Sequence, residues 1–161
     1  MALLVLLLPL VRGLCPSTTI TSSSTGSLVE RSTGVYTPSV LVTPHPAWAT
    51  LAGASWIWES SAQSLGPFKY QSTFTLAEWA RTSISGLKLH IAADNRYAVT
   101  FNGVVVAPQW TGSYSPVKIY ELKQWAVGSS EALGVQENSL VILALNSGGP
   151  AGLIYKLEVV Y

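Results

Sequence analysis

The sequence predicts an all-β protein, an antiparallel jelly-roll β-sandwich preceded by an extended N-terminal arm. Three observations lead to this expectation. Short segments of alternating or continuous apolar residues recur along the chain, turn-forming residues separate them, and a Ser/Thr-rich stretch comes first. With 161 residues, the chain suits one domain with a sizeable core. Its only cysteine is Cys15, so six Trp and seven Tyr, rather than a disulfide, are expected to supply stability.

Residues 1–15 form an apolar leader that is similar to the core of a secretory signal. Val11 and Gly13 suit the positions just before a cleavage site. The apolar run is shorter than the about 20 residues that cross a bilayer, so we expect no membrane span. The leader is either cleaved or retained, and a retained leader would have to bury its apolar side chains. We expect an extracellular or cell-surface location.

Residues 16–46 are expected to form a Ser/Thr/Pro-rich extended arm. One interpretation is a flexible linker or a stalk that carries O-linked sugars. The other is an extended segment that adds to an exposed sheet edge, because Thr and Val favour strands and proline tolerates edge positions. Val35, Val40 and Val42 are the candidate anchoring side chains for such an addition.

Residues 47–161 have the pattern of the β-sandwich itself. LAEWARTS at 76–83 favours a short helix or helical turn, and Trp125 is expected to cap an edge of the core. Trp56 and Trp58 alternate with Ile57 and are expected on one buried face. The expected strands cover 55–60, 68–76, 86–93, 96–103, 104–108, 117–122, 139–146 and 153–161.

Two of these strands carry the clearest signals. SLVILALN at 139–146 is almost wholly apolar, which predicts a central strand buried on both faces or nearly so. Tyr97, Val99 and Phe101 alternate along 96–103 and are expected in the core. Asn102-Gly103, just after them, fits a two-residue type I′ hairpin turn.

The order of these motifs resembles the galactose-binding-like β-sandwich. Its most specific part is AADNRYAVTFNG at 92–103, and the resemblance covers about residues 47–161. Domains of that kind are jelly rolls of two antiparallel sheets, found beside glycosidase modules, in lectins and in extracellular structural proteins. The resemblance therefore implies a fold, and the function has to come from a site.

Asp94 is the only aspartate in the sequence and precedes Asn95 between two expected strands. One interpretation makes Asp94 a calcium ligand or a sugar-binding acid. The other makes it a turn residue whose carboxylate accepts backbone N–H groups, and we favour this one. Calcium is accordingly a candidate ligand only, and no other cofactor is expected.

An enzyme is not expected. The two histidines, His45 and His90, have no second histidine at a metal-binding spacing, and no G-x-S-x-G motif accompanies Asp94. Nothing in the sequence selects a pair of carboxylates for glycoside hydrolysis. The formal net charge of +1 does not attract nucleic acid over distance, so no nucleic-acid partner is expected.

Two functions remain. The first hypothesis is a secreted structural subunit that self-assembles into an extracellular fibre or sheath by N-terminal strand exchange. Without Arg12 of the leader, eight Lys and Arg balance eight Asp and Glu, and the arm favours strands. The alternative is a carbohydrate-binding, lectin-like module. In the alternative, Trp110 and Tyr114 stand in a Gly/Ser/Pro-rich loop as sugar-stacking rings, with Asn95 and Arg96 near the same rim.

Overall fold

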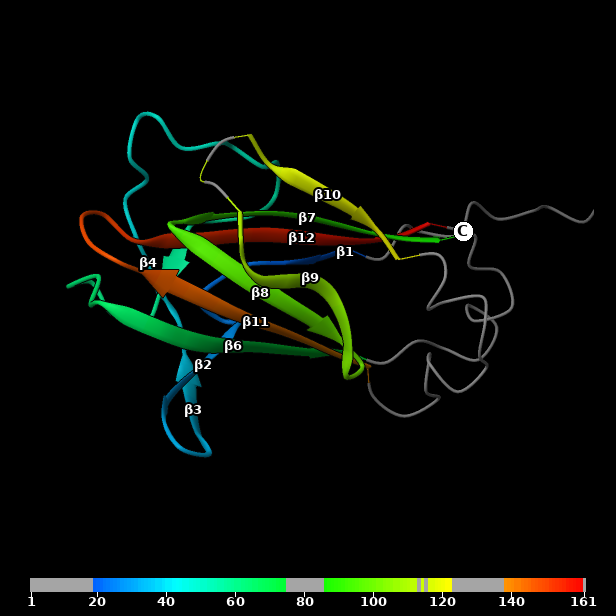
Figure 1. Cartoon of the computed structure of the whole chain (residues 1–161), viewed down its shortest axis with the longest axis horizontal. Helices are drawn as coiled ribbons and strands as arrows, with labels where there is room; N and C mark the ends of the chain where they lie inside the picture. Colours follow the sequence, from blue (N-terminus) through cyan, green and yellow to red (C-terminus); the bar gives the residue numbers. More distant parts are fainter. Residues whose placement is uncertain (1–18, 75–85, 113, 115, 123–137, 161) are drawn as a thin grey trace, which may run out of the picture.

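The computed structural model describes residues 19–74, 86–112, 114, 116–122 and 138–160, and they form two antiparallel sheets (Figure 1). Sheet A runs in the order β10 (Lys118–Glu121), β7 (Gly86–Asp94), β12 (Gly152–Val160), β5 (Ile57–Trp58), β4 (Val40–Leu41). A sixth strand of this sheet, β1 (Thr19–Thr21), pairs with β12 outside that order. Sheet B runs in the order β3 (Val35–Pro38), β2 (Leu28–Ser32), β6 (Gly66–Phe74), β11 (Asn138–Asn146), β8 (Arg96–Phe101), β9 (Val104–Thr111).

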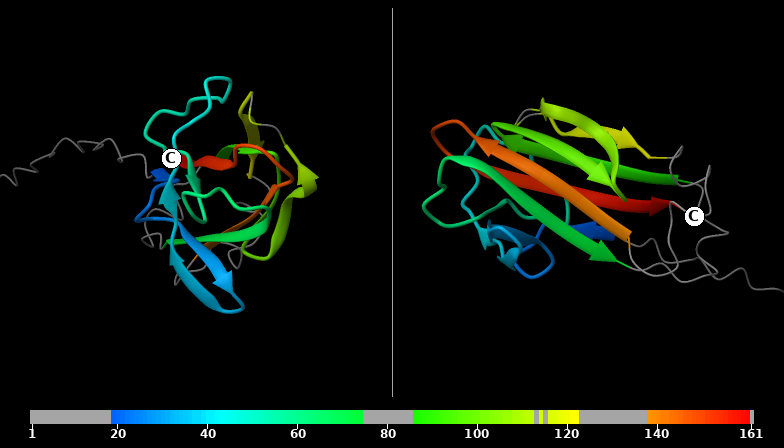
Figure 2. Two further views of the ribbon diagram at one scale, coloured as in Figure 1. Left: turned by 90° about the vertical axis from the view of Figure 1, so that its left-hand side faces the viewer. Right: turned by 60° about the horizontal axis from the view of Figure 1, so that its bottom comes forward.

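The two sheets lie face to face, which confirms the predicted all-β sandwich (Figure 2). Alternate residues of each strand point inward and bury a large aromatic and aliphatic core. Its largest fully buried members are Trp58, Tyr70, Tyr97, Tyr155, Phe101, Ile57, Leu87, Leu89, Ile91, Leu122, Leu140 and Ile142. Among the described residues there is no membrane-spanning helix.

The two strands with the clearest sequence signals form as expected. β11 is central, between β6 and β8, although only alternate residues are fully buried and those between them are half-buried. Tyr97, Val99 and Phe101 of β8 lie in the core. Asn102 and Gly103 both have positive φ, 48° and 80°, as a type I′ turn requires.

The expectation that Trp56 and Trp58 share one face is wrong. Trp58 packs between the sheets, whereas Trp56 packs against Trp48 in a second cluster, with ring centroids 4.4 Å apart and ring planes tilted by 34°. The physical reason is that β5 contains only Ile57 and Trp58, so the alternation of a longer strand does not apply there. Trp56 instead belongs to the segment that covers the outer face of sheet A.

The described part of the expected arm differs from a free segment, because it supplies strands to its own sandwich. β1 pairs with β12, β2 pairs with β3 and β6, and β4 pairs with β5. Of the three candidate anchors, Val42 packs against the core and Val40 lies half-buried opposite Trp58, while Val35 is 53% exposed on β3.

Serine hydroxyls explain this incorporation. Ser22 Oγ donates to the Ser55 carbonyl at 2.7 Å, and the backbone N–H of Tyr155 donates to Ser22 Oγ at 3.1 Å. Ser27 Oγ and the Tyr155 hydroxyl lie 2.7 Å apart, and Ser72 Oγ lies 2.5 Å from the same hydroxyl. The polar composition that suggests a linker thus satisfies buried hydrogen bonds within the chain.

Three expectations concern residues outside the described ranges: the leader at 1–15, the helix at 76–83 and the core-capping role of Trp125. They stay predictions.

Candidate functional site: a groove across sheet B

The outer face of sheet B contains two adjoining hollows, which together we name the sheet B groove. Their volumes are about 180 Å³ and about 460 Å³. The smaller hollow is lined by Ala98, Val99, Thr100, Val105, Ala107, Gln109, Val141 and Leu143. The larger one is lined by Glu30, Thr33, Pro67, Phe68, Lys69, Gln109, Trp110 and Leu143. Because Gln109 and Leu143 line both hollows, the two hollows adjoin each other on this face.

Strand register builds the floor of this groove. Leu143 of β11 lies opposite Lys69 of β6 on one side and Ala98 of β8 on the other. One strand further, Val29 of β2 pairs with Tyr70, so Glu30 follows next to Lys69. Residues opposite one another in neighbouring strands point to the same face, so this row crosses the sheet on its outer side.

A bulge in β9 brings Trp110 to the groove. Tyr97 pairs with Thr111 and Val99 pairs with Ala107, so three residues of β9 stand opposite Ala98 alone. Such insertions bend a strand and redirect its side chains. Trp110 has a φ of 60°, and Thr111 Oγ1 donates to the Pro108 carbonyl at 2.8 Å, which closes the bulge. The half-buried Trp110 side chain lines the larger hollow.

The polar end of the larger hollow carries an ion pair. Lys69 Nζ lies 3.3 Å from Glu30 Oε2 and 5.3 Å from the centroid of the Tyr36 ring. The Tyr36 hydroxyl donates to Glu30 Oε2 at 3.4 Å, and the Gly34 N–H donates to Glu30 Oε1 at 2.6 Å. The side chains of Glu30, Lys69 and Tyr36 and the Gly34 N–H therefore fix one another's positions. They lie at the end of the groove that the β2–β3 hairpin forms.

These contacts keep both charges in place. The Gly34 N–H, more than the Lys69 ammonium, holds the pKa of Glu30 below its ordinary value of 4.5. Contact with Tyr36, followed by Glu30, raises the pKa of Lys69 above 10.5. Both side chains are thus ionised at neutral pH, and their charges cancel.

The groove combines an aromatic ring with several kinds of hydrogen-bonding group. Glu30 accepts, Lys69 donates, and the Gln109 amide and Thr33 hydroxyl can do both. A sugar ring presents an apolar face of C–H groups and a rim of hydroxyls. An indole ring can pack against the apolar face, and polar side chains around the ring can form hydrogen bonds with the hydroxyls.

The other predicted sugar-binding residues, Tyr114, Arg96 and Asn95, are not among the described residues that line the two hollows. Tyr114 is 42% exposed, and its carbonyl accepts a hydrogen bond of 3.0 Å from Ala49 N–H. Arg96 is exposed but lines neither hollow of the groove. Asn95 Oδ1 accepts from the backbone N–H and the hydroxyl of Ser147, at 2.7 and 3.1 Å. Asn95 therefore fastens a turn.

Among the described residues, Asp94 accepts hydrogen bonds from two side chains, and not from the backbone N–H groups that the favoured turn interpretation expected. Trp48 Nε1 donates to Asp94 Oδ2 at 2.8 Å, and Asn95 Nδ2 donates to Asp94 Oδ1 at 2.6 Å. Burial raises the pKa of Asp94, which the Trp48 hydrogen bond and the nearby charge of His45 partly oppose. Within the described ranges, no group of three or more His, Cys, Asp or Glu gathers around a metal-sized space. Calcium at Asp94 stays a prediction.

Sequence reasoning found Trp110 but missed Glu30, Lys69 and Gln109. An aromatic residue in PQWTGSYSP is conspicuous, whereas a Glu in a Ser/Thr-rich stretch and a Lys in a strand are ordinary. Only the pairing of β2 with β6 places the two charges together. No local sequence signal specifies that long-range pairing.

Comparison with known proteins gives similarity in fold only. No protein-family model matches the chain, and no curated protein matches it. A β-glucuronidase from Ruminococcus gnavus, solved with D-glucuronic acid, is 12% identical with a TM-score of 0.50, over 89% of this chain and 30% of that one.

Two further structures are similar at lower TM-scores. A β-D-glucuronidase from Dictyoglomus thermophilum is 14% identical, with a TM-score of 0.49, over 89% of this chain and 28% of that chain. A family 35 carbohydrate-binding module from Clostridium thermocellum is 13% identical, with a TM-score of 0.42, over 87% of this chain and 97% of that one.

The chain thus spans less than a third of the two glucuronidases, and its likeness to them concerns one β-sandwich. Together with the two antiparallel sheets described above, the similarity to the Ruminococcus gnavus enzyme confirms the resemblance in fold that the order of the sequence motifs implied. The protein has the jelly-roll fold of galactose-binding-like domains.

Proposed function

We propose that the protein is an extracellular, non-enzymatic glycan-binding protein and that the sheet B groove is its binding site. One observation carries the proposal. The ring of Trp110 lines a hollow of about 460 Å³ together with the ion-paired Glu30 and Lys69. The hollow is within the size range of about 300 to 1,000 Å³ that small-molecule sites occupy. The galactose-binding-like fold is one that lectins use, which supports the proposal.

The charges of the groove favour a neutral glycan. Glu30 and Lys69 are already paired at 3.3 Å, so an ionic ligand would have to compete with one of them for the other. Neutral hydroxyls instead bond to both groups without separating them. Gln109, between the two hollows, offers an amide to the same ligand.

Binding fits the groove better than hydrolysis. Glycoside hydrolysis by the usual mechanism needs two carboxyl groups on either side of the scissile bond. Among the described residues that line the groove, Glu30 is the only carboxylate. The proposal therefore assigns recognition to this face and no bond cleavage.

Self-assembly by strand exchange receives no support from the contacts of the arm. The donor strands expected between 16 and 46 pair within their own chain wherever the structure describes them. Glycan binding needs no such donor, and it has a built groove with an aromatic ring. We therefore place glycan binding first.

The test is glycan binding by the purified chain, first on a glycan microarray and then by isothermal titration calorimetry with the best soluble oligosaccharide. Replacing Trp110 by Ala should weaken binding by at least about tenfold, since a stacked ring contributes on the order of 1.5 kcal/mol. Tyr114→Ala is the matched control, because it removes an exposed ring that lies outside the groove.

The two variants separate the alternatives. Full binding by Trp110→Ala together with lost binding by Tyr114→Ala would move the site to the rim that the sequence suggested. No binding to any glycan on the array by the folded wild-type protein would refute the function itself.

The Lys69→Met variant tests the polar end of the groove. It should reduce affinity while changing the free energy of unfolding by less than about 1 kcal/mol, as partly exposed ion pairs contribute little.

A further inference from the structure

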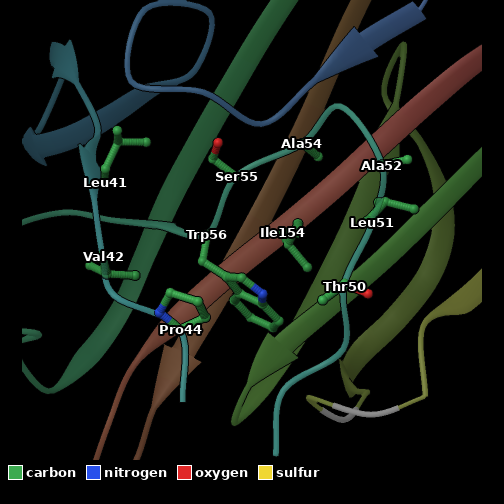
Figure 3. Close-up of a pocket in the computed structure, with 10 residues that line it drawn as sticks. All are labelled: Leu41, Val42, Pro44, Thr50, Leu51, Ala52, Ala54, Ser55, Trp56 and Ile154. Atoms are coloured by element: carbon green, nitrogen blue, oxygen red, sulfur yellow. The ribbon is translucent and has the colours of Figure 1, made fainter. Parts of the chain in front are cut away.

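A second hollow, on the outer face of sheet A, has a chemistry unlike that of the groove. Residues 41–56 form a loop with two limbs, and Trp56 and Ile154 lie between them (Figure 3). We name this hollow the sheet A cup. Its volume is about 500 Å³. The residues that line it are Leu41, Val42, Pro44, Thr50, Leu51, Ala52, Ala54, Ser55, Trp56 and Ile154.

Hydrogen bonds hold the two limbs in place, so the cup is preformed. Val42 N–H donates to the Trp56 carbonyl at 3.0 Å, and Ala54 N–H donates to the Leu51 carbonyl at 3.1 Å. Trp56 Nε1 donates to the Ala49 carbonyl at 2.9 Å, which fixes the ring plane. A preformed cavity spares its ligand the entropic cost of ordering the walls.

The floor of the cup is fixed equally well. Trp56 packs against the tilted ring of Trp48 with ring centroids 4.4 Å apart, and Trp48 Nε1 donates a hydrogen bond to Asp94. Ile154 of β12 is 2% exposed and packs in the same cluster. If the loop collapsed into the hollow, the contact between the Trp48 and Trp56 rings or the hydrogen bonds of their indole N–H groups would be lost.

The lining excludes ions and glycans as the preferred ligand. Of the ten lining residues, Thr50 and Ser55 alone have polar side chains, and each offers one hydroxyl. None of the described residues that line the hollow has a charged or amide side chain. Water inside such a cavity finds few partners, so an apolar molecule displaces it favourably.

We propose that the sheet A cup binds one small, uncharged, mainly apolar molecule, such as an aromatic or branched aliphatic compound. This inference goes beyond glycan binding, because it concerns the opposite sheet. A small molecule suits the cup better than a peptide strand. The hollow is walled on two sides, and the backbone N–H of Val42 that a strand would use already bonds to Trp56.

The experiment uses the full chain and the neutral fluorophore phenylnaphthylamine, whose emission rises in apolar surroundings. We expect saturable binding at one site, with energy transfer from tryptophan to the probe. A sulfonated analogue of the same ring system should bind at least about tenfold more weakly, since the cup offers no cation to an anion.

Filling the cup should abolish the signal. Ala52→Phe and Ala54→Phe each place a ring in the hollow and should weaken probe binding by at least about tenfold. Ala62→Phe is the matched control, because Ala62 is exposed and does not line the cup. Ala52 is itself exposed, so its variant should fold even if Ala54→Phe does not.

Two results would overturn the proposal. One is unchanged probe affinity in the folded Ala52→Phe variant. The other is absence of saturable probe binding to the wild-type chain. The Trp110→Ala variant should keep full probe affinity, because Trp110 does not line the cup. Glycan binding therefore tests the groove and probe binding tests the cup, and either proposal can fail without the other.

Discussion

The indole Nε1 of Trp48 donates a hydrogen bond of 2.8 Å to Oδ2 of the buried Asp94 carboxylate. This bond links the segment that covers sheet A to the end of β7. It also joins the sheet A cup to a titratable group, since Trp48 packs against the floor residue Trp56. The stability of that end of the sandwich should therefore depend on pH.

Burial raises the pKa of Asp94 above its ordinary value of 3.8, so the folded state binds this proton more tightly than the unfolded state. The stability that Asp94 contributes is therefore fully present below the ordinary pKa and is lost as pH rises through the folded-state pKa. The quantity to follow is the difference in unfolding free energy between the wild type and Asp94→Asn. We expect this difference, wild type minus variant, to fall as pH rises from about 3 and then to level off. Urea unfolding at a series of pH values measures this difference. A difference that grows with pH would mean that hydrogen bonding to the carboxylate outweighs its burial.

Gly112 is held against the ring of Tyr97. A Cβ at this position would lie 2.1 Å from Tyr97 Cε1, and Tyr97 is fully buried. Gly112→Ala should therefore reduce the free energy of unfolding by about 1 to 3 kcal/mol more than Gly66→Ala. Gly66 is a close match, with a φ of 119° against 120° and nothing within 4 Å of its added Cβ. Equal losses in thermal or urea unfolding would show that backbone conformation alone, and not the ring, requires glycine.

Gly152 lies against the rings of Trp48 and Trp56. An added Cβ would be 2.7 Å from Trp56 Cε3 and 2.8 Å from Trp48 Cζ3. We expect Gly152→Ala to destabilise the protein by about 1 to 3 kcal/mol and to change near-ultraviolet circular dichroism from the indoles. Gly26→Ala is the comparison, because there the close atom is the hydroxyl of Ser23 rather than a packed ring. An unaltered indole signal in Gly152→Ala would contradict the packing described.

The Tyr155 hydroxyl joins the N-terminal strands to the core through Ser27 and Ser72. Tyr155→Phe keeps the ring but leaves two buried serine hydroxyls with one partner fewer, at a cost of about 1 to 3 kcal/mol. Hydrogen exchange should rise mainly in 22–39, which the hydroxyl fastens. Tyr120→Phe is the matched control, because it removes a hydroxyl on β10 that contacts Tyr97 at 3.1 Å, and it should leave that exchange unchanged. Equal exchange in the wild type and Tyr155→Phe would show that 22–39 is held by strand pairing alone.

The sequence predicted those parts of the fold whose signals are local. The alternation in 86–93 and 139–146 matches β7 and β11 to within one residue, because period-two burial is a property of each strand by itself. The Asn102-Gly103 turn was predictable for the same reason, since its chemistry involves two adjacent residues.

The sequence failed where distant segments decide the outcome. β9 extends to Thr111 through Pro108, because a bulge absorbs the proline that should have ended the strand. The Ser/Thr-rich stretch looked like a linker, since its composition alone does not show that Ser22 and Ser27 meet Tyr155. The ion pair of the groove is similar, because strand pairing determines it and neither residue is unusual by itself.

The pairing of β1 with β12 has a consequence for how this domain can be connected. Thr19 lies opposite Glu158, so the chain enters and leaves the described sandwich at one pole, far from the turn at Asp94 and Asn95 (Figure 1). A tether attached directly at Thr19 or at Val160 would emerge from that pole. Surface immobilisation through a tag at either of these two residues should accordingly present the broad faces of both sheets sideways to solution.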